Sequence, residues 1–156
     1  MRLAERISPA AIECAFRADG KQEAIAGLVG MLDRAYGPLD QRAIVRAVLN
    51  REELISTGVG GGVALPHARS EAVRDVMVGV GIAPAAVDFD AQDGQVVRIF
   101  FMIVGPLDRM LQRTQLEVEA RISMLLKSEG FCEALLGCSG AEDVLACIRS
   151  FETGVG

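Results

Sequence analysis

Residues 51–69 read R-E-E-L-I-S-T-G-V-G-G-G-V-A-L-P-H-A-R, and the rest of the chain is best understood outward from this stretch. Four of the five residues from 58 to 62 are glycine, which predicts a loop whose backbone takes positive φ and can approach a ligand closely. A short strand is expected over residues 63–65, ending at Pro66 and His67. The stretch therefore predicts a glycine-rich loop that leads directly to a presented imidazole.

The residue types in this stretch suit phosphate chemistry. Consecutive N–H groups of a glycine loop bind anions, and an arginine can hold a phosphoryl group through two parallel hydrogen bonds. Pro66 fixes the backbone ahead of His67, and a neutral imidazole nitrogen can accept a phosphoryl group. The predicted site consists of the acceptor His67, the clamp Arg51, and the donors Ser56, Thr57, Gly58, Gly60, Gly61 and Gly62.

The glycine run does not match two common nucleotide-binding patterns. It lacks the G-x-x-x-x-G-K-[ST] spacing of a P-loop, and the G-x-G-x-x-G spacing fails at Val63 or Leu65. Two simpler interpretations stay open on composition alone. His67 could be a loop residue without a function, and the glycines could form only a flexible connector.

The flanking segments alternate between helical and extended patterns. Apolar residues at helical spacing predict helices, and alternating or continuous apolar runs predict strands. Helices are expected over residues 19–36, 40–51, 110–127 and 131–136 and after residue 139, and further strands over residues 76–82 and 98–104. Because residues 99–104 are apolar throughout, both faces of the sheet should be covered. The expected fold class is α/β, in a single domain over residues 1–156.

Composition excludes several kinds of partner. The chain has 156 residues, of which 51% are hydrophobic, enough for one complete core. Its 16 basic and 21 acidic residues give a net charge of −5, which argues against nucleic acid as a partner. The longest strongly apolar run is residues 99–104, far short of the about 18 residues of a membrane helix. No membrane insertion is expected.

The cysteines and the charged N-terminus indicate a cytoplasmic protein. No C-x-x-C pair exists and the chain has one histidine, so neither a metal site nor a disulfide framework is expected. Reduced, buried thiols are the better interpretation for Cys14, Cys132, Cys138 and Cys147. Charged residues close to the N-terminus leave no apolar core for a secretory signal, and no attached transporter domain is expected.

The pattern R-E-x-x-x-S-T-G-V-G-G-G-V-A-L-P-H-A resembles the phosphorylation-site signature of type-2 enzyme IIA domains. These belong to the phosphoenolpyruvate-dependent phosphotransferase system, in its fructose, mannitol and nitrogen-regulatory branches. The pattern D-F-D-A-x-D-G-Q-x-V at residues 88–97 is also similar to that family. The resemblance is specific over residues 43–104, looser over the flanking helices, and strongest toward the nitrogen-regulatory members.

This resemblance carries expectations for the whole site. It implies that His67 is the phosphoacceptor through Nε2, that Arg51 lies beside it, and that no cofactor is needed. It implies a three-layer sandwich, in which helices flank both faces of a mixed sheet of about five strands. The donor would be the histidine-containing phosphocarrier protein (HPr) or its nitrogen-branch paralogue.

One departure from the family bears on the chemistry. Members usually carry a second histidine early in the helix expected here over residues 110–127, and this chain has none. Gln112 or Thr114 stands roughly at that position, and neither side chain can carry positive charge. The family position that often holds Asn or Glu is Gly61. We therefore expect weaker stabilisation of the phosphorylated form or a changed transfer rate.

Four functions are compatible with these residues to different degrees. The favoured one is a phosphohistidine carrier with a regulatory output toward a target protein. The second is a sugar-uptake component that passes the phosphoryl group to a cysteine of a separate enzyme IIB. The third is a regulatory binding module that is poorly phosphorylated. A hydrolase is least supported, because no nucleophile or metal cluster can be assigned.

Overall fold

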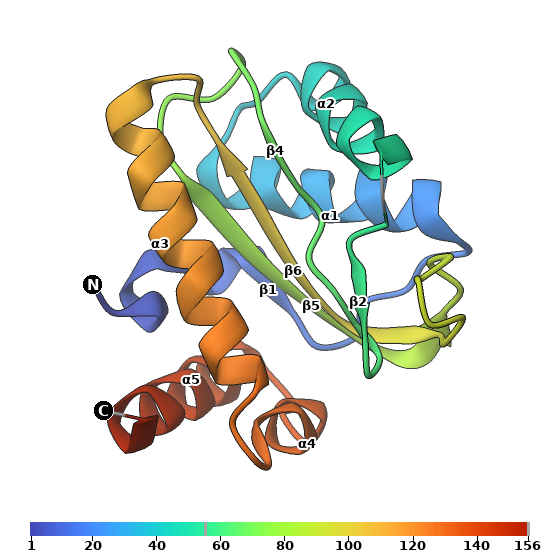
Figure 1. Ribbon diagram of the computed structural model, residues 1–156, viewed down its shortest axis with the longest axis vertical. Coiled ribbons are helices and arrows are strands. Elements are labelled where there is room, and N and C mark those ends of the chain that lie inside the picture. Colours follow the sequence, from blue (N-terminus) through green and yellow to red (C-terminus); the bar gives the residue numbers. More distant parts are fainter. Residues whose placement is uncertain (55, 156) are drawn as a thin grey trace.

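The computed structural model describes residues 1–54 and 56–155, and its ribbon is shown in Figure 1. The chain begins with the 3₁₀ turns η1 (Leu3–Arg6) and η2 (Pro9–Ala11). The helices are α1 (Lys21–Tyr36), α2 (Gln41–Leu54), α3 (Arg109–Leu126), α4 (Phe131–Leu136) and α5 (Ala141–Val155). The strands are β1 (Ile12–Glu13), β2 (Gly58–Gly60), β3 (Val63–Ala64), β4 (His67–Arg69), β5 (Met77–Val87) and β6 (Val97–Gly105).

The strands of the described residues form one mixed sheet with β6 at its centre. Its order is β1-β5-β6-β3-β2, and β4 also pairs with β6. On one side β6 runs antiparallel to β5, and on the other it runs parallel to both β3 and β4. The turn between β2 and β3 makes a short antiparallel hairpin. Two separate short strands, β3 and β4, therefore lie in line along the same edge of β6.

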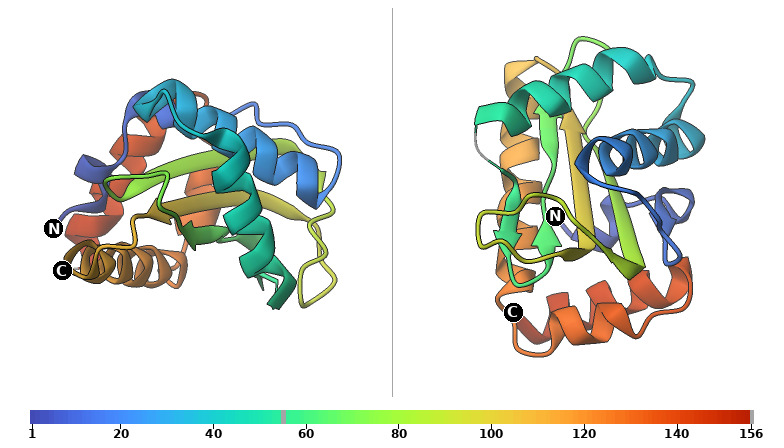
Figure 2. Two further views of the ribbon diagram at one scale, coloured as in Figure 1. Left: turned by 90° about the horizontal axis from the view of Figure 1, so that it is seen from above. Right: turned by 90° about the vertical axis from the view of Figure 1, so that its right-hand side faces the viewer.

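Side chains of β6 alternate between two cores, one on each face of the sheet. Phe100 and Met102 pack with α1 and α2, and the Phe100 ring contacts the rings of Phe16 and Phe89. Phe101 and Ile103 pack on the opposite face with α3, α4 and α5. The views in Figure 2 show helices on both sides of the sheet. The predicted three-layer α/β sandwich is confirmed, with six strands in the described residues instead of about five.

The main differences from the sequence-based prediction concern short strands. Part of the predicted loop over residues 56–62 is strand β2, and His67 is the first residue of β4 instead of following a strand. Strand β5 also continues to Val87, beyond the alternating pattern. The pairing of these short segments with distant parts of the chain stabilises them, and a local pattern cannot report such pairing.

The four cysteines are free thiols, and each is half-buried instead of buried as predicted. Burial raises the pKa of all four thiols, that of Cys147 to about 11. Little thiolate therefore forms at neutral pH, which slows oxidation. No helix among the described residues has the length and apolar character needed to cross a bilayer.

Candidate functional site

The backbone at His67 is fixed by its pairing with the central strand β6. His67 pairs with Ile103 in the parallel β4–β6 ladder, and the Ile103 N–H donates to the Pro66 carbonyl at 3.1 Å. Pro66 is buried and has no N–H of its own, so the edge strand is interrupted between β3 and β4. The central strand of the sheet thus fixes the backbone position from which the His67 side chain extends.

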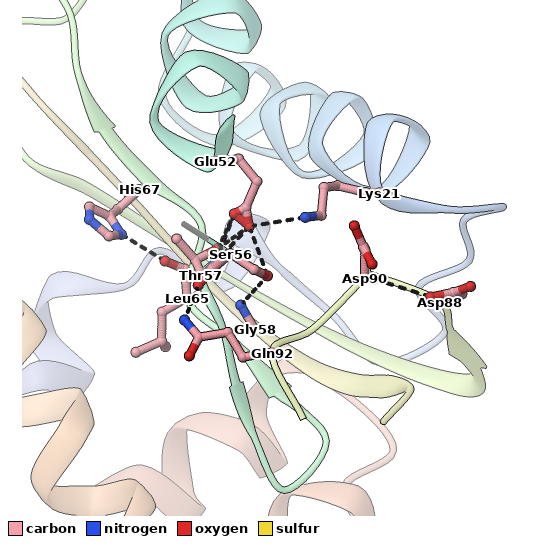
Figure 3. Close-up of polar contacts among 10 residues, drawn as sticks. All are labelled: Lys21, Glu52, Ser56, Thr57, Gly58, Leu65, His67, Asp88, Asp90 and Gln92. Atoms are coloured by element: carbon pink, nitrogen blue, oxygen red, sulfur yellow. Dashed lines mark hydrogen bonds and ion pairs between the residues drawn. The ribbon is translucent and has the colours of Figure 1, made fainter. Parts of the chain in front are cut away.

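The imidazole ring is oriented by a second contact. Its Nδ1 lies 2.8 Å from the Leu65 carbonyl oxygen, a contact drawn in Figure 3. A carbonyl oxygen can only accept, so Nδ1 carries the proton and the neutral ring keeps its lone pair on Nε2. The nitrogen left for chemistry is Nε2, the one that the resemblance implies.

His67 lines an open pocket of about 520 Å³ between α2, β4 and α3. Besides His67, the polar lining consists of Asn50 and Arg51 on α2, Arg69 on β4, and Gln112, Gln115 and Glu119 on α3. The rim includes three exposed leucines, Leu54 (81% exposed), Leu107 (51%) and Leu116 (59%). The pocket therefore combines an imidazole nitrogen, two guanidinium groups, one carboxylate and an apolar rim.

Of the predicted site residues, the structure brings Arg51, His67 and Gln112 to this pocket. The lining described for the pocket does not include Thr114, Ser56 or Thr57, nor the glycines from 58 to 62. The described contacts of the glycine loop lie within the chain: the Gly61 N–H donates to Asp93 Oδ2 at 3.3 Å, and the Gly62 carbonyl accepts from Arg98. Direct phosphate binding by these amides stays a prediction.

Three residues of the glycine turn have backbone angles that favour glycine. Gly60, Gly61 and Gly62 have φ of 95°, 64° and 79°. A Cβ on Gly60 would lie 3.1 Å from Asp93 Oδ2, whereas one on Gly61 would meet nothing within 4 Å. The turn sets the register of the hairpin that carries Leu65, and so contributes to the placement of His67.

Gly60→Val is expected to destabilise the protein by about 1–3 kcal/mol, because a β-branched residue is strained at positive φ. Thermal unfolding measures the change. Gly61→Asn is the matched control, since asparagine tolerates this region of φ and the position is open. Equal melting temperatures for the two variants would contradict the requirement for glycine at position 60.

Gln115 is one of the pocket residues that sequence reasoning missed, as is Arg69. Gln115 is 4% exposed, and its Nε2 donates to the Ala68 carbonyl at 3.3 Å and to Glu119 Oε1 at 3.4 Å. Its Oε1 is buried and has no hydrogen-bond partner among the described residues. A signal existed: position 115 falls on the inward stripe of α3 with Val118 and Ile122, where a polar residue is unusual.

A sandwich that holds one imidazole by its backbone and by Nδ1, at a pocket lined by arginines, defines an α/β domain built to present a single histidine. The chain belongs to the enzyme IIA type-2 family: the sequence model described as "Phosphoenolpyruvate-dependent sugar phosphotransferase system, EIIA 2" matches residues 6–151.

Known relatives include a fructose-specific component and nitrogen regulatory proteins. The chain is 30% identical over 152 residues to the PTS system fructose-specific EIIABC component of Bacillus subtilis, an alignment covering 97% of this chain and 24% of that protein. It is 26% identical over 148 residues to the nitrogen regulatory protein of Bradyrhizobium diazoefficiens, covering 95% of each. The crystal structure of nitrogen regulatory protein IIA-Ntr from Neisseria meningitidis superimposes with a TM-score of 0.84 and 27% identity, covering 94% of this chain and 98% of that one.

Proposed function

We propose that this protein is a cytoplasmic phosphohistidine carrier that accepts a phosphoryl group from an HPr-type protein on Nε2 of His67. The observation that carries the proposal is the Nδ1 contact to the Leu65 carbonyl at 2.8 Å, which leaves Nε2 as the nucleophile in a pocket that also contains Arg51. Residues 1–156 would act as one enzyme IIA domain.

The transfer step needs little covalent chemistry from the protein. The Nε2 lone pair attacks the phosphorus of the donor's phosphohistidine, the P–N bond of the donor breaks, and its electron pair returns to the donor imidazole. The ring of His67 becomes positively charged as the new P–N bond forms, and the Leu65 carbonyl stabilises the Nδ1–H of that ring. The main tasks left to the domain are alignment and charge stabilisation of the phosphoryl oxygens.

Polar residues of the pocket supply the groups that would stabilise the charge on the phosphoryl oxygens. Arg51 and Arg69 bring positive charge to the wall that faces the phosphoryl group, and Gln112 adds an amide. The predicted donors Ser56 and Thr57 would act less directly, because the Thr57 N–H and hydroxyl already donate to Glu52. We assign the phosphate contacts first to Arg51 and Gln112.

The rim of the pocket suits a protein partner. Leu54, Leu107 and Leu116 are exposed beside an otherwise polar site, and clustered exposed apolar side chains mark surfaces that bind other proteins. A donor or target that docks on these leucines would place its own reacting group over His67. A second macromolecule, and not a small sugar, would therefore cover the pocket during transfer.

A regulatory output is favoured over sugar uptake by the full-length match to a nitrogen regulatory protein, 95% of both chains. The match to a fructose-specific component supports the alternative, in which His67 passes the phosphoryl group to a cysteine of an enzyme IIB. Incubating the phosphorylated protein with IIB proteins encoded in the same genome separates the two outputs. Transfer to a IIB cysteine would favour uptake.

The test of the proposal is intact-protein mass spectrometry after incubation with phosphoenolpyruvate, enzyme I and an HPr-type carrier. We expect a gain of one phosphoryl group that is lost in acid and retained in base, as for an N–P bond. Omitting the HPr-type carrier is the control. No mass gain with any HPr-type carrier from the same genome would contradict the proposal.

A further inference from the structure

Glu52 is a buried carboxylate in the last turn of α2, next to Arg51. Its side chain is 2% exposed, and Lys21 Nζ lies 3.7 Å from its Oε1. Its oxygens accept the Thr57 N–H at 2.7 Å and the Thr57 hydroxyl at 2.8 Å. A carboxylate that accepts two hydrogen bonds from one residue fixes both the backbone and the side chain of that residue.

The chain of contacts continues from Thr57 to the imidazole. The Thr57 carbonyl accepts the Leu65 N–H at 2.9 Å, which extends the β2–β3 pairing by one residue. The Leu65 carbonyl in turn accepts the proton on His67 Nδ1 at 2.8 Å. Figure 3 shows the carboxylate, Thr57, Leu65 and the ring in this sequence, from the end of α2 to His67.

We propose that Glu52 is a positioning residue for His67, acting through Thr57 and Leu65. The proposal rests on the proposed function of His67 as phosphoacceptor and explains how its reactive nitrogen is selected. Each link fixes the next: Glu52 holds Thr57, Thr57 holds Leu65, and the Leu65 carbonyl keeps the proton on Nδ1. Glu52 touches neither the ring nor any phosphoryl group, so its effect on transfer would be indirect.

A second consequence concerns Arg51. Because Glu52 ties the last turn of α2 to the β2–β3 hairpin, it also fixes the end of the helix that carries Arg51 relative to the strand edge that carries His67. A misplacement of about 1 Å between reacting groups can cost a factor of about 100 in rate. The buried carboxylate of Glu52 thus fixes the positions of His67 and Arg51 relative to each other.

Glu52→Gln tests the inference, because the amide keeps the size of the side chain but removes its charge and replaces one of the two acceptor oxygens of the Thr57 N–H and hydroxyl by an NH₂ donor. We expect the ¹⁵N spectrum of His67 to show a smaller share of the Nδ1–H form. We also expect kcat for phosphorylation to fall roughly tenfold to a hundredfold at unchanged KM for the donor, since Glu52 is buried and does not line the pocket.

Glu152→Gln is the matched control. Glu152 is also buried, is 8% exposed, and accepts two backbone N–H groups, those of Leu3 and Ala4. Those contacts lie between α5 and η1, so this variant should lose stability without altering the His67 spectrum. If Glu52→Gln does not fold, Thr57→Val serves as the second variant, because it removes only the hydrogen bond from the Thr57 hydroxyl to Glu52. The ¹⁵N spectrum of His67 is again the measurement, and a smaller change is expected.

The spectrum separates this inference from the proposed function. A His67 spectrum that is unchanged in Glu52→Gln, or in Thr57→Val if Glu52→Gln does not fold, would overturn the positioning role whatever the transfer rate. A changed spectrum in a protein that no HPr-type carrier phosphorylates would support the positioning role and reject the carrier function.

Discussion

Replacing His67 with alanine is expected to abolish phosphorylation while leaving the domain folded. His67 is the only histidine of the chain, so the variant has no imidazole left to form an acid-labile P–N bond. The side chain is half-buried, and the contact it loses is the Nδ1 bond to Leu65. That bond contributes about 0.5–1.5 kcal/mol, a small part of the stability of a domain of this size.

The measurement combines intact-protein mass after incubation with the phosphoryl donor and circular dichroism during heating. We expect no mass gain and a melting temperature within about 6 °C of the wild-type value. A phosphoryl group on the variant would place the acceptor on another residue type, and its stability in acid would reveal which. A variant that unfolds would instead show that His67 is a structural residue.

The long elements of the fold could be predicted because their patterns are local. The continuous apolar run that became β6 and the stripes of α1 and α3 follow from residue spacing alone. Strands β1 and β4, by contrast, are two and three residues long, and long-range pairing with β5 and β6 defines them. No period can be recognised in so few residues.

Site residues that lie close together in the sequence were predictable. Site residues that the fold brings in from distant segments were harder to predict. Arg51 and His67 were identified from one stretch, and the pocket brings them together. Gln115 lies 48 positions beyond His67 and reaches the site only because α3 packs beside β4. Glu52 lies within the same stretch, yet its proposed role depends on contacts that the sequence does not reveal: the Thr57 N–H donates to Glu52, and the Leu65 N–H donates to the Thr57 carbonyl.

Arg51→Ala is expected to slow phosphoryl transfer to His67 by a factor of about 10²–10³ with the fold retained. The phosphoryl oxygens carry negative charge through the transition state, and an arginine that faces them stabilises that charge where water is excluded. Arg51 matters more here than in relatives with a second histidine, because the amides of Gln112 and Gln115 supply no positive charge. The loss should appear in kcat, measured by quenched-flow phosphorylation.

Two further variants make this expectation specific. Arg46→Ala removes an exposed guanidinium from the same helix and should transfer at the wild-type rate. Arg51→Lys keeps the charge but not the two-pronged geometry, so an intermediate rate is expected. Equal rates for Arg51→Ala and the wild type would mean that other residues stabilise the charge of the phosphoryl group. Arg69 would then be the next pocket cation to test. A rise in KM alone would instead place Arg51 in the docking surface.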